Sequence, residues 1–125
     1  MSSDRPSSNA DRWNRVFHAL SAALRREVIV ALNDAPPDER VSLPGSIVCP
    51  PDRNEEAIRA KLHHSHLPVL AERDYVEWEP DPLRAWRGPA FDEVNVVLQE
   101  LAERTHELPE QLVADCPHLE ARASD

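Results

Sequence analysis

The chain has 125 residues, of which 41% are hydrophobic and 30% are charged. This length suits one domain with a single core, and the composition is typical of globular rather than disordered proteins. No apolar run approaches the ~20 residues of a membrane helix, and the Ser- and Asp-rich amino terminus has no apolar signal segment. The two glycines, Gly45 and Gly88, lie far apart, which excludes glycine-rich phosphate loops. We therefore expect a soluble cytoplasmic protein.

The charge is strongly acidic and unevenly distributed. Asp and Glu number 23 against 14 Lys and Arg, and Lys61 is the one lysine. Such a surface is typical of adaptation to a salt-rich cytoplasm, where the Debye length falls to about 3 Å. A GC-rich genome would also favour Arg over Lys. Residues 74–125 hold thirteen acids and four Arg, whereas residues 1–33 and 57–73 each have a net charge of +2. Net charge argues against nucleic acid as a partner, but these basic segments leave it open.

Two helices are expected first. Apolar residues recur at helical spacing from Trp13 to Leu20, with Asp11 as the predicted N-cap. Ser21 is the predicted cap of a second helix. This helix must end before Pro36, because a residue preceding proline is pushed out of the helical region.

A short strand at 41–43 and a long helix follow. The segment 44–51 contains three prolines and a glycine, which oppose a prolonged helix. Asp52 or Asn54 can cap the next helix, predicted over 55–72.

The remaining elements are a hairpin and a carboxyl-terminal helix. Pro68 should kink the long helix or mark a boundary in it. Aromatic content and alternation predict a strand at 75–79, and the return strand is 83–87. A helix over 92–107 could form a homodimer through four apolar residues: Val94, Val97, Leu98 and Leu101.

This element order is that of a winged helix-turn-helix domain with an additional carboxyl-terminal helix. The fold class is therefore mainly α with a small β-hairpin wing (α+β). We assign the domain to residues 11–113 and its wing to 75–87. Residues 1–10 and 114–125 are expected as a disordered tail and a polar tail.

Two motifs carry a family resemblance. Residues 62–77 read LHHSHLPVLAERDYVE, and residues 86–94 read WRGPAFDEV. They resemble the "LHHxHLPxLAxxGxVE" and "RGPxFxEI" segments of winged helix-turn-helix domains from halophilic archaea. Residues 16–26 resemble the opening of those domains. The resemblance covers residues 12–113 and implies a DNA-binding transcriptional regulator with double-stranded DNA as its partner.

The sequence departs from the family pattern at two places. Asp74 replaces a glycine, and Asp can adopt the left-handed conformation at some cost. The proline-rich segment 44–51 replaces the helix that precedes the recognition helix. This second departure supports an alternative function, a winged-helix protein-interaction module without DNA binding. In that case Trp13 or Trp86, left exposed in a patch, would mark the partner surface.

The long helix is the predicted recognition helix. Projection at 100° per residue places apolar residues and His63 and His66 on one arc. The other arc carries small residues around Lys61 and His64, with Arg59 and His63 at its border. Small residues let a helix sit deep in the major groove, where Lys61 could bind guanine or phosphate and His64 a base edge. The alternative is a solvated face rich in alanine.

Four further arginines are candidate DNA contacts. Arg84 and Arg87 on the return strand could reach phosphates or the minor groove, or instead pair with Glu77 and Glu79 across the hairpin. Arg25 and Arg26 at the start of the second helix could hold the DNA backbone, or instead be surface charges.

Neither a metal site nor catalysis is expected. His63 and His66, or Cys116 and His118, have spacings that could share zinc, but no third ligand lies at tight spacing. Cys49 and Cys116 are too few for a disulfide framework. The carboxylates form no motif with a base or a nucleophile, so we expect no enzyme and no cofactor.

Overall fold

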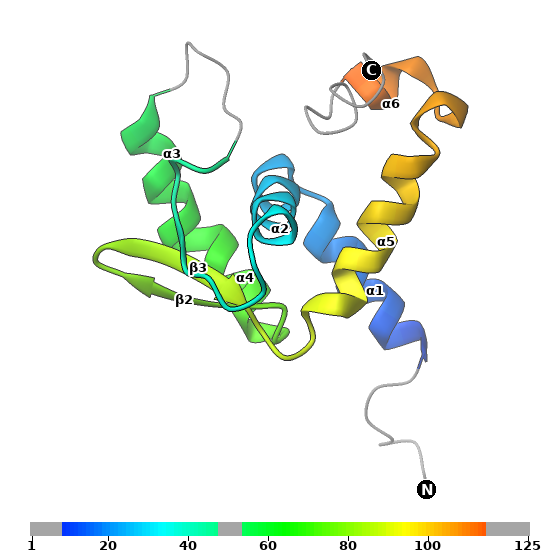
Figure 1. The fold of residues 1–125 in the computed structure, drawn as a ribbon. Coiled ribbons are helices and arrows are strands. Elements are labelled where there is room, and N and C mark those ends of the chain that lie inside the picture. The colour runs from blue at the N-terminus through cyan, green and yellow to red at the C-terminus, as the bar shows by residue number, and fades with distance from the viewer. Residues whose placement is uncertain (1–8, 48–53, 115–125) are drawn as a thin grey trace, which may run out of the picture.

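The computed structural model describes residues 9–47 and 54–114 (Figure 1). In chain order the elements are α1 (Asn9–Leu20), α2 (Ala23–Asp34), β1 (Val41–Ser42), α3 (Glu55–Lys61), the π-helical turn η1 (Leu62–His66), α4 (Leu67–Glu72), β2 (Val76–Pro80), β3 (Leu83–Arg87), α5 (Phe91–Glu103), the 3-10 turn η2 (Thr105–Glu107) and α6 (Glu110–Ala114). Residues 1–8 and 115–125, which include most of the two predicted tails, lie outside the described residues. Asn9 and Ala10 belong to α1, so this helix begins before the predicted cap at Asp11.

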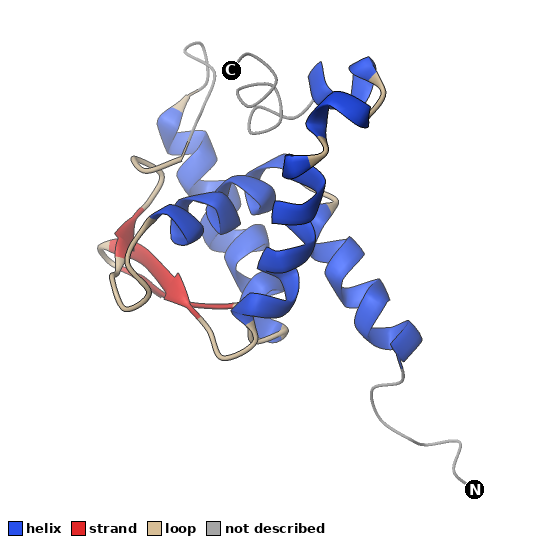
Figure 2. Ribbon diagram, turned by 45° about the vertical axis from the view of Figure 1, so that its right-hand side comes forward, coloured by secondary structure: helices blue, strands red, loops and turns tan. Residues whose placement is uncertain are grey.

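The three strands form one antiparallel sheet in the order β1-β3-β2. Ala85 at the centre of β3 pairs with Val41 on one side and Trp78 on the other. The sheet lies at one edge of the molecule, and helices make up most of the rest (Figure 2). The fold is therefore mainly α with a small antiparallel sheet, which confirms the predicted winged-helix-like fold class.

The core lies between the sheet and the helices. Its largest fully buried side chains are Tyr75, Phe91, Ile29, Leu32, Leu62, Leu67, Leu70 and Leu98. They come from α2, from the long central helix, from the start of the hairpin and from α5, so one cluster joins the four segments. This shared core fixes the long helix against the rest of the domain.

Helix boundaries follow the predicted signals in part. Asn54 caps α3, where its Oδ1 accepts hydrogen bonds from the backbone N–H of Glu56 at 2.8 Å and of Ala57 at 3.4 Å. Helix α2 ends at Asp34, before Pro36, as expected. The prediction for Ser21 was wrong, because the N-cap position is Ala22 and the Ser21 hydroxyl instead donates to the carbonyl of His18 at 2.7 Å.

The predicted helix over 55–72 is continuous but changes register at η1. The N–H of Leu67 donates to the carbonyl of Leu62, five residues earlier, which defines a π turn. Pro68 follows at once; it has no N–H, and its ring would crowd the carbonyl of His64 in a regular α-helix. The widened turn also brings Leu67 onto the face of Ile58 and Leu62, and all three are buried. The predicted boundary at Pro68 is confirmed.

Asp74 and Gly88 form a tight junction between α4 and α5. Asp74 has φ 63°, so it adopts the left-handed conformation expected from its place after the helix. Its carbonyl accepts from the N–H of Ala90 at 2.8 Å, and the carbonyl of Tyr75 accepts from the N–H of Gly88 at 3.0 Å. A Cβ on Gly88 would lie 2.6 Å from the Asp74 carbonyl oxygen. Glycine is needed at 88 because two backbone segments approach each other there.

Two segments differ from a regular winged helix. After β1, the described residues up to Ile47 form turns. The N–H of Ser46 donates to the carbonyl of Ser42, and the N–H of Ile47 donates to the carbonyl of Pro44. Residues 48–53 lie outside the described residues. The predicted helix over 92–107 is shorter than expected, because α5 ends at Glu103 and η2 follows. In the ranges 9–47 and 54–114, no helix has the length and apolar character needed to cross a membrane.

Candidate nucleic-acid interface

The outward face of α3 and η1 matches the projected arc. Ala57, Ala60, Lys61 and His64 are exposed, and so is Arg59 at the border. The opposite face is buried through Ile58, Leu62, Leu67 and Leu70. We call five of these residues the recognition face: Ala57, Arg59, Ala60, Lys61 and His64. Its small side chains leave the helix backbone accessible to a groove.

His63 connects the recognition face to the wing. Its ring packs edge-on against Trp78 of β2, with ring centroids 5.4 Å apart. Its Nδ1 lies 3.4 Å from Nδ1 of His64. A cleft of 260 Å³ opens between helix and hairpin; its lining residues are Glu56, Arg59, Ala60, His63, His64, Pro80 and Leu83. His63 is therefore half-buried and forms part of the wall of this cleft.

Arg25 is a structural residue, and its prediction as a DNA contact was wrong. Only 7% of the residue is exposed. Its guanidinium donates to the carbonyls of Ala19 at 3.0 Å and His18 at 2.7 Å, and lies 3.0 Å from Nδ1 of His66. The two carbonyls belong to the last turn of α1, which has unsatisfied acceptors and the negative end of the helix dipole. The surface-charge alternative was wrong too.

Arg26 and Arg87 also satisfy helix ends. Arg26 Nη1 donates to the carbonyl of Leu20 at 2.6 Å. Arg87 Nε and Nη2 donate to the carbonyl of Leu32 at 3.1 and 3.0 Å, and Nη2 also donates to the carbonyls of Asn33 and Ala35. The Arg87 guanidinium also lies over the ring of Phe91, 5.0 Å from its centroid. Arg87 is bound through both Nε and Nη2, which corrects its assignment to DNA, whereas Arg26 uses only Nη1 in this way.

Arg84 pairs across the hairpin, as the alternative interpretation predicted. Its guanidinium forms an ion pair with Glu79, its register partner on β2. Arg40 binds the same carboxylate at 3.1 Å, and its guanidinium lies 4.0 Å from the centroid of Trp86. The indole N–H of Trp86 donates to Glu77 at 2.9 Å. Trp86 is thus half-buried on the wing and forms no open apolar patch.

Sequence reasoning did not identify the cluster of Arg40, Glu79 and Arg84. Cross-strand pairing of residues 79 and 84 could be read from the hairpin register. The third member could not, because Arg40 precedes the distant strand β1, and only the sheet order brings it to β3.

Two cations remain available on the recognition face. Neither Arg59 nor Lys61 makes an ion pair with another of the described residues, and both side chains are exposed. Glu55 and Glu56 in the first turn of α3 lie on the same helix. The wing adds the carboxylates of Glu77 and Glu79. On this face the positive charges therefore lie in the last turn of α3.

The predicted dimer residues divide into two pairs. Val94 and Leu98 are 0% and 1% exposed and belong to the domain's own core, so they cannot contact a partner. Val97 is half-buried, and Leu101 is 40% exposed. Both remain available at the surface of α5.

Within residues 9–47 and 54–114, no group of three or more His, Cys, Asp and Glu side chains is placed to hold a metal ion. His63 and His66 diverge, since His66 faces Arg25 and His63 faces Trp78. Cys49, Cys116 and His118 lie outside the described residues. Comparisons of this chain with protein-family models, curated proteins and solved structures give no match.

Proposed function

We propose that this protein is a DNA-binding transcriptional regulator that inserts α3 and η1 into the major groove. The observation that carries the proposal is the composition of the recognition face, in which two alanines surround Arg59, Lys61 and His64, all exposed. A B-DNA major groove about 12 Å wide admits an α-helix, and small residues allow close approach. The family resemblance of residues 12–113 supports the same function.

Each side chain of the recognition face has a distinct role in this proposal. Lys61 and Arg59 donate to guanine or to phosphate oxygens, and His64 donates to or accepts from a base edge. His63 packs on Trp78 and lines the cleft between the recognition face and the wing. The hairpin contacts the DNA by shape complementarity and not through a charge on Arg84, because the Arg84 guanidinium is paired with Glu79.

Because few cations lie on the recognition face, DNA binding depends on shape complementarity more than on charge. Each phosphate neutralised by a cation contributes about −0.9 to the slope of log K against log salt. Two cations give a protomer a shallow slope, so its affinity for DNA falls less with added salt than that of a strongly basic protein. The net charge of −9 acts in the same direction, because it provides no long-range attraction to DNA.

The test is the fluorescence anisotropy of a labelled duplex pool, titrated at low and at molar KCl. The double variant Lys61→Glu/His64→Glu should abolish binding. Arg104→Glu is the control, because it reverses one exposed cation at the far end of α5. Retained binding by the double variant would contradict the assigned face. Absence of wild-type binding at both salt concentrations, with a folded circular dichroism spectrum, would contradict the regulator itself.

The second candidate is a winged-helix protein-interaction module without DNA binding. It is favoured by the net charge of −9 and by the internal use of Arg25 and Arg87. The same titration separates the two candidates, since this one predicts no DNA binding at any salt concentration.

A further inference from the structure

Large apolar side chains are exposed on α1, α5 and α6. In the described parts of the chain these residues are Trp13, Phe17, Val96, Leu101 and Leu112. Trp13 and Phe17 lie one turn apart on α1 and stack with ring centroids 5.4 Å apart. Two aromatic rings more than half exposed are unusual on a monomer's surface and mark an interaction site.

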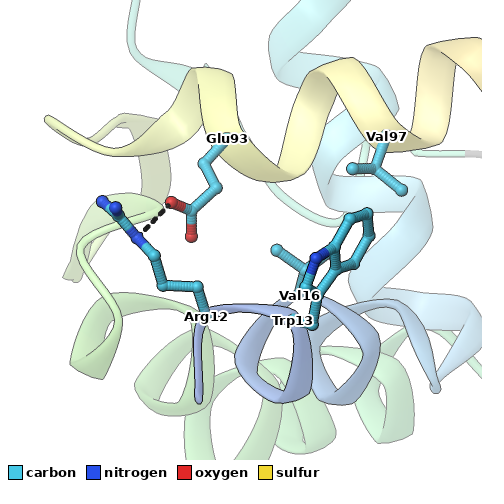
Figure 3. A pocket seen from close by; sticks show the side chains of 5 residues that line it. All are labelled: Arg12, Trp13, Val16, Glu93 and Val97. Atoms are coloured by element: carbon cyan, nitrogen blue, oxygen red, sulfur yellow. Dashed lines mark ion pairs between the residues drawn. The ribbon is translucent and has the colours of Figure 1, made fainter. Parts of the chain in front are cut away.

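A cleft lies beside these rings, between α1 and α5. It has a volume of 310 Å³, and its lining residues are Arg12, Trp13, Val16, Glu93 and Val97. Figure 3 shows Arg12 and Glu93 at one end and Trp13 and Val97 at the other. Glu93 pairs with Arg12 at 3.3 Å and accepts the Tyr75 hydroxyl at 2.8 Å, which fixes the polar end. At the apolar end, Trp13 stacks on Phe17, which lies one turn further along α1.

We propose that this face binds a second copy of the chain, with Phe17 of each copy inserted into the cleft of the other. An apolar cavity of about 150 Å³ holds a benzene ring, so the cleft has room for a phenyl side chain. A projecting ring and a receiving cleft on the same surface are self-complementary, which is what a two-fold symmetric interface requires.

The charges indicate how the two copies pair. Helix α5 carries Asp92, Glu93, Glu100 and Glu103 and no basic residue, whereas α1 carries Arg12 and Arg15 against Asp11, with Arg12 paired to Glu93 of the same copy. Packing α5 against its own copy would juxtapose carboxylates. Packing α1 against α5 of the other copy avoids this repulsion and brings Arg15 toward the carboxylates of α5. The interface therefore crosses from α1 to α5, and does not use Val94 and Leu98.

The apolar area is sufficient for the centre of an interface. An aromatic side chain buries about 150–250 Å², so two half-exposed rings offer about 200 Å² per copy. Val96 and Leu101 extend this area along α5. A stable interface buries about 800 Å² per partner, with an apolar centre and a polar rim. The charged residues of α1 and α5 provide that rim.

Sedimentation equilibrium of the full chain without DNA tests the proposal independently of DNA binding. The wild type should show a concentration-dependent monomer–dimer equilibrium. Phe17→Ser should raise the dimer dissociation constant about tenfold or more. Leu112→Ser is the matched control, because Leu112 is 58% exposed against 56% for Phe17 and lies on α6; it should leave the constant unchanged.

Glu100→Arg tests the pairing of helices. It adds a cation to the surface that faces α1 of the other copy, so it should weaken the dimer. A stronger dimer would show that α5 packs against α5 and would overturn the proposed arrangement. A wild type that stays monomeric at all concentrations, or a Phe17→Ser variant that dimerises normally, would overturn the interface itself.

Discussion

The guanidinium of Arg25 lies 3.0 Å from Nδ1 of His66, and this contact ties the start of α2 to the π turn of the long helix. The same guanidinium holds the last carbonyls of α1. Arg25 can only donate, so Nδ1 of His66 must accept, and the ring is neutral with its proton on Nε2. One buried cation thus joins three helices behind the recognition face.

This geometry predicts a pH dependence of stability. Burial, and then the positive charges of Arg25 and Lys61, lower the pKa of His66 below its ordinary value of 6.5. Below pH 6.5 the unfolded chain takes up a proton at this histidine while the folded chain does not. The free energy of unfolding should therefore fall as the pH drops below about 6.5. Urea denaturation at a series of pH values measures it.

Two substitutions test whether His66 causes this pH dependence of stability. His66→Asn keeps an acceptor for Arg25 and cannot titrate, so the loss of stability below pH 6.5 should shrink. His106→Asn is the control, because His106 is exposed on η2. An unchanged pH profile in His66→Asn would show that another group titrates.

Arg25→Met should destabilise the domain by about 3 kcal/mol, because it leaves buried acceptors without a donor. Arg104→Met, at an arginine whose side chain is 64% exposed, should change the free energy of unfolding by less than about 0.5 kcal/mol. Urea denaturation compares the two. Equal effects would contradict the role of Arg25 in closing the end of α1.

Gly88→Ala should cost about 2 kcal/mol or more, since the new Cβ would lie 2.6 Å from backbone oxygen that cannot move independently. Gly45→Ala is the matched control, because a Cβ there meets nothing within 4 Å. Thermal unfolding followed by circular dichroism distinguishes them. A similar melting temperature for both variants would argue against the tight junction at Asp74.

Asp74→Gly should stabilise the domain by about 0.5 kcal/mol, because glycine adopts φ 63° without strain, partly offset by the greater entropy of the unfolded chain. Asp74→Ala should be less stable than the wild type, since alanine has no side-chain acceptor to support the left-handed conformation. Urea denaturation of the three proteins gives the order. A destabilised Asp74→Gly variant would mean that the aspartate side chain contributes more than the strain costs.

Local signals in the sequence predicted the order of the elements and several of their boundaries. The Asn54 cap, the end of α2 before Pro36 and the left-handed Asp74 each depend on a few neighbouring residues. Within α3 and η1, helical projection also separated the buried arc from the exposed arc.

The partners of the arginines could not be predicted in this way. Arg87 binds the carbonyl of Leu32, 55 residues earlier, and Arg25 meets His66, 41 residues later. Such contacts exist only once the helices are packed. For the same reason, the apolar stripe of α1 did not reveal that Trp13 and Phe17 stay outside while Val16 and Leu20 enter the core.

The most direct test of the proposed interface is the salt dependence of DNA binding in two neutralising variants. Lys61→Gln should weaken binding and reduce the slope of log K against log salt by about 0.9 per bound protomer. Arg84→Gln should leave the slope unchanged, because that guanidinium is already paired with Glu79. Unchanged affinity and slope in Lys61→Gln, or a reduced slope in Arg84→Gln, would contradict the recognition face described above.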